Sequence, residues 1–193
     1  QIPFLRQYDT KIIANVSGNT VEEYEGMVEK ISDADVDLIE MNISCPNVKC
    51  GGMAFGTQPK MVEEVVSAAK AKAKKPLIVK LSPNVTDIAE IARAAESAGA
   101  DALSLINTLL GMRIDIEKRK PILSNVMGGL SGPAVFPVAV RMVYQVRKAV
   151  SVPILGMGGV ATGADAVEMM MAGATAVAVG TACFADPYAP LKV

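Results

Sequence analysis

The stretch Pro153-Ile-Leu-Gly-Met157-Gly-Gly159-Val-Ala161 decides which kind of α/β fold this chain forms. Its first half is a short apolar run that predicts a strand, and its second half fits the G-x-G-x-x-A pattern of dinucleotide-binding sheets. A dinucleotide site also needs an acidic residue about 20 positions further on to bind the ribose. Positions 169–185 contain no acid, which disfavours an open Rossmann sheet.

The rest of the chain alternates apolar strand-like runs with helical segments. The expected strands are 11–16, 37–43, 76–81, 101–107, 153–157 and 175–180. The expected helices are 20–31, 57–73, 86–99, 135–150 and a segment that begins after Thr162. Thr20 and Glu23 have the spacing of a capping box, and Thr162 is expected to cap its helix.

Two strand–helix–strand units, which begin at Pro76 and Pro153, resemble each other and pass through the same Ala-Gly-Ala turn. Such units are typical of a parallel α/β fold. We expect a (β/α)8 TIM barrel in which about six of the eight parallel strands belong to this chain. Residues 1–193 are expected to form a single barrel domain that is incomplete at both ends.

Positions 113–117 alternate apolar and charged residues, which is the period of a strand. A charged turn at 118–120 and a return at 122–126 predict an antiparallel ribbon inserted above the main sheet. An ordinary long loop is the alternative.

Composition excludes several classes of function. The net charge is −1 and no basic run is present, so a nucleic-acid partner is not expected. The chain has no histidine, and its three cysteines lack the spacing of a zinc site, so no metal is expected. Prolines and glycines interrupt the uncharged stretch 121–140, so we expect no membrane span. An odd number of cysteines favours a reducing cytoplasm.

The segment Met41-Asn-Ile-Ser-Cys45-Pro-Asn47 follows an apolar run and places amides and a thiol at the end of a strand. Amides can hold a planar polar ligand, and a thiol beside them can move a proton. A buried free cysteine before a proline turn is the structural alternative. Asn107 and Thr108 end another strand and place further polar groups at the same edge, unless they serve only as a turn cap.

Glycines follow the last two strands, at Gly158-Gly159 and Gly180-Thr181. In (β/α)8 barrels these two loops commonly bind a phosphate through backbone N–H groups, although glycines also serve tight turns. Lys80 lies in an apolar strand, where its ammonium needs an anion unless the side chain reaches solvent. A phosphorylated cofactor fits both features.

These motifs occur together, and in this order, in one enzyme family. They are Asn42-Ile-Ser-Cys45-Pro-Asn47-Val-Lys, Val79-Lys80-Leu-Ser-Pro-Asn84, Ile106-Asn107-Thr108, Gly129-Leu-Ser-Gly132-Pro133, Gly156-Met-Gly-Gly159 and Val179-Gly-Thr181. The chain resembles the class 1 dihydroorotate dehydrogenases, and most of all their B type, along essentially its whole length. The set of motifs is specific, whereas any one of them alone is not.

The resemblance implies a cytoplasmic flavoprotein, an oxidoreductase that uses FMN to oxidise dihydroorotate to orotate in pyrimidine biosynthesis. By motif match, Cys45 is the general base that takes the C5 proton while a hydride passes from C6 to FMN. Substrate would be held by Asn42, Asn47, Asn107 and Thr108. FMN would be lined by Asn15, Asn42, Lys80, Ile106, Gly132, Gly158, Gly159, Gly180 and Thr181. Lys80 would stabilise the reduced flavin anion.

The resemblance also implies a homodimer that works with a second subunit, which carries FAD and an iron–sulfur cluster and passes electrons to NAD. The family's first two barrel strands have no counterpart here, so the chain is expected to lack the N-terminal part and, alone, to bind FMN weakly. A related dihydropyrimidine dehydrogenase is an alternative, which Asn47 disfavours, and a non-catalytic barrel fragment is another.

Overall fold

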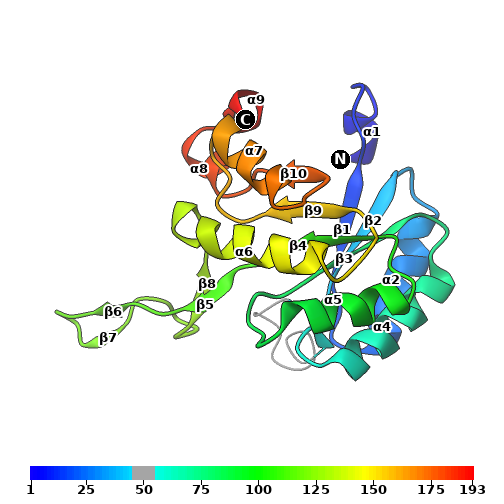
Figure 1. Cartoon of the computed structure of the whole chain (residues 1–193), viewed down its shortest axis with the longest axis horizontal. Coiled ribbons are helices and arrows are strands. Elements are labelled where there is room, and N and C mark those ends of the chain that lie inside the picture. Colours follow the sequence, from blue (N-terminus) through cyan, green and yellow to red (C-terminus); the bar gives the residue numbers. More distant parts are fainter. Residues whose placement is uncertain (45–54) are drawn as a thin grey trace.

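A computed structural model describes residues 1–44 and 55–193 and contains a six-stranded parallel sheet with helices packed against it (Figure 1). The strands of this sheet are β1 (Ile13–Val16), β2 (Leu38–Asn42), β3 (Leu77–Lys80), β4 (Ala102–Leu105), β9 (Ile154–Met157) and β10 (Ala176–Ala178). Each of the six lies within a segment that the sequence predicts to be a strand.

Neighbouring strands of the sheet follow one another along the chain, in the order β1-β2-β3-β4-β9-β10. In a doubly wound sheet the strand order reverses at a switch point. The order of these six strands does not reverse. The sequential parallel order is that of a (β/α)8 barrel. The prediction of barrel architecture, with six parallel strands in this chain, is therefore confirmed.

Helices form the outer layer. They are α1 (Ile2–Leu5), α2 (Val21–Ser32), α4 (Pro59–Lys72), α5 (Ile88–Ser97), the 3-10 turn η1 (Pro133–Val135), α6 (Phe136–Arg147), α7 (Gly163–Met171), α8 (Ala182–Ala185) and α9 (Ala189–Lys192). The longer helices α2, α4, α5, α6 and α7 contact one another in chain order, as expected for the outer ring of a barrel.

The two expected helix caps are present. Thr20 Oγ1 accepts a hydrogen bond from the amide of Glu23, and the Glu23 carboxylate accepts one from the amide of Asn19. Thr162 and Asp165 form a full capping box at the start of α7. These side chains fix where α2 and α7 begin, because they satisfy amides that have no partner within the helix.

The two faces of the sheet differ in polarity. Ile39, Met41, Leu77, Val79 and Leu103 are fully buried and belong to the apolar core. Since side chains alternate along a strand, the residues between them point to the opposite face, which lies inside the curled sheet. That inner face carries polar side chains from several strands.

The inserted ribbon projects from the body of the molecule (Figure 1). It consists of two antiparallel pairs, which are β5 (Leu109–Gly111) with β8 (Gly128–Leu130) and β6 (Ile114–Asp115) with β7 (Lys120–Pro121). The ribbon is confirmed, but the expected return at 122–126 is wrong. Asp115 accepts hydrogen bonds from the amides of Glu117 and Lys118, which tightens the turn so that the return begins at Lys120.

Candidate functional site

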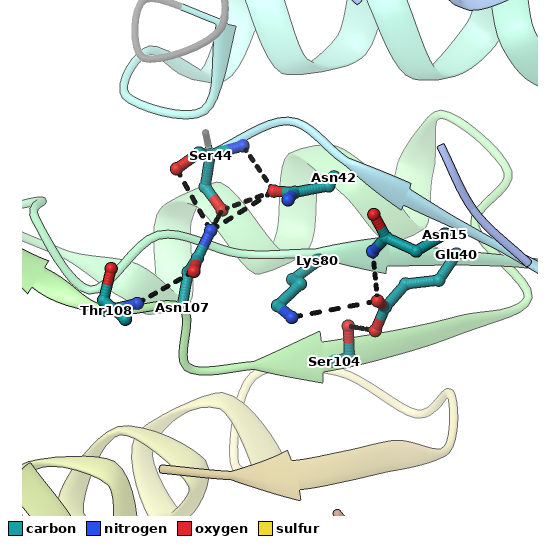
Figure 2. Close-up of polar contacts among 8 residues, drawn as sticks. All are labelled: Asn15, Glu40, Asn42, Ser44, Lys80, Ser104, Asn107 and Thr108. Atoms are coloured by element: carbon teal, nitrogen blue, oxygen red, sulfur yellow. Dashed lines mark hydrogen bonds and ion pairs between the residues drawn. The ribbon is translucent and has the colours of Figure 1, made fainter. Parts of the chain in front are cut away.

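Four successive strands each contribute a polar side chain to one network on the inner face of the sheet (Figure 2). Glu40 of β2 is its centre and is 7% exposed. Its Oε1 accepts a hydrogen bond from Ser104 Oγ of β4 at 2.6 Å, and its Oε2 accepts one from Asn15 Nδ2 of β1 at 2.5 Å. Lys80 Nζ of β3 lies 3.8 Å from Glu40 Oε2. The network therefore holds one positive and one negative charge side by side.

A second polar cluster joins the carboxyl ends of β2 and β4 (Figure 2). The amide nitrogen of Asn107 donates to Ser44 Oγ at 2.6 Å, to the Ser44 carbonyl at 3.1 Å and to Asn42 Oδ1 at 3.2 Å. Asn107 Oδ1 in turn accepts a hydrogen bond from the amide of Thr108 at 2.9 Å. These contacts fix the orientation of the Asn107 amide, since its oxygen and its nitrogen each have a defined partner.

A cavity of about 370 Å³ opens beside both polar groups. This volume lies in the range of about 300–1,000 Å³ that is usual for small-molecule sites. Its wall consists of Ile13, Glu40, Lys80, Ile106, Asn107, Thr108, Leu130, Ser131, Val135, Leu155, Met157, Gly158, Gly159, Ala178, Val179, Gly180 and Thr181. Apolar side chains thus face a few fixed polar groups, which is the usual composition of a cofactor or substrate pocket.

The glycines at the ends of β9 and β10 line one part of this cavity. Gly158 and Gly159 have φ angles of 121° and 84°, which favour glycine. A Cβ at Gly180 would meet nothing within 4 Å, so the space beside this residue in the pocket is open. Within the part of the chain that the structure describes, the amides of Gly158, Gly159 and Gly180 donate no hydrogen bond. These N–H groups can therefore bind an oxyanion.

The loop that carries Gly158 and Gly159 is fixed by hydrogen bonds to Asp165. Asp165 Oδ2 accepts hydrogen bonds from the amides of Ala161 at 3.0 Å and Thr162 at 2.8 Å. The hydrogen bond from the Ala161 N–H lowers the pKa of Asp165 most, and the hydrogen bonds with Thr162 lower it further. The pKa therefore lies below its ordinary value of 3.8. The ionised carboxylate is thus the form that fixes this loop.

The structure brings together most of the site residues expected from the sequence. Those that line the cavity are Lys80, Ile106, Asn107, Thr108, Gly158, Gly159, Gly180 and Thr181. Asn15 and Asn42 adjoin it through Glu40 and Asn107. Gly132 lies just behind, because a Cβ on Gly159 would come within 2.7 Å of the Gly132 carbonyl oxygen. Cys45 and Asn47, and also Cys50, lie outside the described residues.

Glu40, Ser44 and Ser104 also belong to the site, although the sequence did not predict them. Glu40 carried a signal, since it is a charged residue in an otherwise buried strand and stands two positions before Asn42, on the same face. The apolar walls of the cavity were missed as well, because Val135, Leu155 and Met157 look like ordinary core residues in the sequence.

Residues 1–44 and 55–193 contain neither a candidate metal centre nor a candidate membrane span. No group of three or more acidic or cysteine side chains is placed to hold a metal ion there. No helix in this part of the chain is both long enough and apolar enough to span a bilayer.

The fold and the pocket define a parallel (β/α) barrel protein with a cavity at the carboxyl ends of its strands. The sequence model of the family described as "Dihydroorotate dehydrogenase" matches residues 3–193. The chain belongs to the dihydroorotate dehydrogenase family.

Individual relatives agree with this assignment. The chain is 69% identical over 192 residues to the dihydroorotate dehydrogenase B (NAD(+)) catalytic subunit of Alkaliphilus oremlandii. The match covers 100% of this chain and 64% of the relative. The corresponding protein of Alkaliphilus metalliredigens is 68% identical, with the same coverage. The chain thus spans about 64% of the length of these curated relatives.

A solved structure supports the same architecture. The dihydroorotate dehydrogenase (DHODH) of Eimeria tenella, crystallised with ferulenol, superimposes with a TM-score of 0.76 and 25% sequence identity. The match covers 91% of this chain and 52% of the Eimeria chain.

Proposed function

We propose that this protein takes part in the oxidation of dihydroorotate to orotate, with FMN as its bound cofactor. The observation that carries the proposal is the position of Lys80. Its ammonium lies in a cavity that has the Asn107 amide cluster on one side and the glycine loops after β9 and β10 on another. Such a cavity offers separate places for a small polar substrate, a cofactor ring and a phosphate.

The pocket residues fit FMN chemically. The amides of Gly158, Gly159 and Gly180, with the Thr181 hydroxyl nearby, suit the phosphate. Ile106 and Gly132 belong to the wall between the phosphate end and the ring. Lys80 would place a positive charge beside the ring, where it stabilises negative charge on the reduced cofactor. When bound, FMN supplies the acceptor for the hydride that leaves C6 of dihydroorotate.

The chain itself would hold the substrate and move one proton. Asn42, Asn47, Asn107 and Thr108 would bind the pyrimidine ring and its carboxylate, because amides and hydroxyls can both donate and accept hydrogen bonds. Cys45 would take the proton from C5, and the C5=C6 double bond forms as the hydride leaves C6. Cys45 is joined by one peptide bond to Ser44, whose carbonyl is bound to Asn107. A reducing cytoplasm suits such a base, since the free thiol must not be oxidised.

The name of the relatives, "B (NAD(+)), catalytic subunit", supports a second subunit that carries electrons onward to NAD. We propose that this partner holds FAD and an iron–sulfur cluster. We also propose that two copies of this chain associate, and the exposed apolar side chains of the ribbon, such as Ile116 and Ile122, support a contact surface.

The test compares two substrates with the purified full-length protein, since the 193-residue chain alone is expected to bind FMN weakly. We expect a yellow protein whose flavin is bleached anaerobically by dihydroorotate within seconds, whereas dihydrouracil leaves it oxidised. Bleaching by dihydrouracil alone would instead favour a dihydropyrimidine dehydrogenase. A colourless protein that binds no added FMN would reject the flavoenzyme and favour a non-catalytic role.

A further inference from the structure

Glu40 is a buried carboxylate to which the proposed chemistry assigns no role. It lies in β2 between two fully buried apolar residues, Ile39 and Met41, yet its own side chain points to the opposite face of the sheet. A charged side chain at this depth is costly unless hydrogen bonds and an opposite charge compensate it. Its three partners come from three different strands, so their positions depend on the register of the whole sheet.

The carboxylate has a fixed orientation. Asn15 is paired with Glu40 in the register of β1 and β2, and its amide binds Oε2, while Ser104, which is fully buried, binds Oε1. Each oxygen therefore has its own donor, and the plane of the carboxylate is set before any ligand arrives. Asn15, which sequence analysis placed against the cofactor, has its amide engaged with Glu40.

Lys80 is held differently. Its ammonium lies 3.8 Å from Glu40 Oε2, which is within the range of an ion pair but beyond that of a hydrogen bond. Among the described residues, Lys80 donates no hydrogen bond. The carboxylate thus attracts the ammonium without using its N–H groups, which remain able to bind a ligand in the cavity.

We propose that Glu40 is a positioning residue, which acts on the cofactor by holding the Lys80 ammonium at the cavity wall. This inference rests on the proposed binding of FMN in that cavity. Fold stability alone does not explain the charge pair, because replacing a buried ion pair with apolar residues is often neutral or stabilising. The pair leaves the N–H donors of Lys80 free, and two further strands fix its acid, Glu40. This arrangement is suited to orienting the lysine.

A double-mutant cycle tests the proposal by fluorescence titration of the apoprotein with FMN. Glu40→Gln keeps the length of the side chain and removes its charge. We expect this change to weaken FMN binding about tenfold in the wild-type background and less than about twofold in the Lys80→Met background. We also expect the visible absorption band of bound flavin to move in the same direction in Glu40→Gln and in Lys80→Met.

Two results would overturn the inference while leaving the proposed cofactor intact. Equal effects of Glu40→Gln in both backgrounds would mean that Glu40 acts on the fold and not through Lys80. Unchanged FMN affinity in Glu40→Gln, with weaker binding in Lys80→Met, would mean that the position of Lys80 does not depend on Glu40. Failure of the wild-type protein to bind FMN would reject both proposals.

Two further variants complete the test. Ser104→Ala removes one of the bonds that fix Glu40, and it replaces Glu40→Gln if that variant does not fold. The same dependence on Lys80 is expected, with an effect of about threefold, and an effect that is independent of Lys80 would again contradict the inference. Asp101→Asn is the matched control, since Asp101 pairs with Lys70 at the opposite end of the sheet and should leave FMN affinity and the absorption band unchanged.

Discussion

The side-chain amide of Asn107, which follows β4, donates to both the hydroxyl and the carbonyl oxygen of Ser44, which follows β2. Strand β3 lies between them in the sheet. The two contacts therefore join the carboxyl ends of two strands that are not neighbours in the sheet. Ser44 lies directly before the segment that contains Cys45. The orientation of Asn107 depends on Ser44, and this dependence can be measured.

Replacing Asn107 should impair substrate use more than replacing Ser44. Asn107→Ala removes a proposed substrate contact and also leaves Ser44 without its donor, so we expect kcat/KM for dihydroorotate to fall about 100-fold. Ser44→Ala leaves the amide in place but less well oriented, and a loss of about tenfold or less is expected. Steady-state kinetics provide the measurement. Asn19→Ala, on the exposed start of α2, should stay close to wild type, and equal losses in the two site variants would contradict the ordering.

Gly180 should be required for cofactor binding but not for folding. A valine there would meet no neighbouring atom within 4 Å of its Cβ, so the fold has room for it, but the side chain would enter the cavity. We expect Gly180→Val to weaken FMN binding by about tenfold or more. The melting temperature of the apoprotein should change by less than about 4 °C.

Gly26 in α2 offers a control for this change, because a Cβ there also meets nothing within 4 Å and lies far from the cavity. Gly26→Ala should leave FMN affinity unaltered and stabilise the protein by about 0.5–1 kcal/mol. If Gly180→Val binds FMN as tightly as the wild type does, the phosphate does not lie at the end of β10.

Cys45 should be needed for turnover and not for the cofactor. Cys45→Ala removes the proposed acceptor of the C5 proton, so we expect kcat to fall by about 100-fold or more, with the flavin content unchanged. Rapid-mixing measurement of flavin reduction by dihydroorotate isolates this step. Cys183→Ala should retain the wild-type rate, since the Cys183 thiol, among the described residues, hydrogen-bonds to the carbonyl oxygen of Val179 and to no other group. A normal rate in Cys45→Ala would remove the thiol from the mechanism.

The loop after β9 should loosen in acid. The folded-state pKa of Asp165 is lowered below 3.8, so its contribution to stability is complete above that pH. The contribution is lost as the pH falls through the lower, folded-state value. We expect the melting temperature to fall more steeply below about pH 4 in the wild type than in Asp165→Asn, which has no carboxyl group to protonate. Parallel acid profiles for the two proteins would show that Asp165 does not contribute in this way.

The strands and helices of the sheet could be predicted because their signals are local. Apolar runs beginning at Pro76 and Pro153 and caps at Thr20 and Thr162 are visible without knowledge of any partner. The amides at strand ends were also predictable, since the carboxyl ends of parallel strands meet at one edge. The return at 122–126 was predicted wrongly because a side chain, Asp115, shortened the turn.

The polar network could not be predicted in the same way. Glu40 is visible in the sequence as a charge in a buried strand, but its partners Asn15 and Ser104 lie 25 and 64 positions away. Which side chains meet depends on how each strand aligns with the next, and no local pattern specifies that alignment.

The alignment of the strands also decides which side chains reach the cavity. A slip of one residue in β2 would turn Glu40 and Asn42 toward the helices and bring apolar Ile39 and Met41 into the cavity. A chain misaligned in this way would lose the charge pair and, with it, the proposed FMN site. Excess FMN should therefore favour the correctly aligned chain by mass action, since only that chain would bind it.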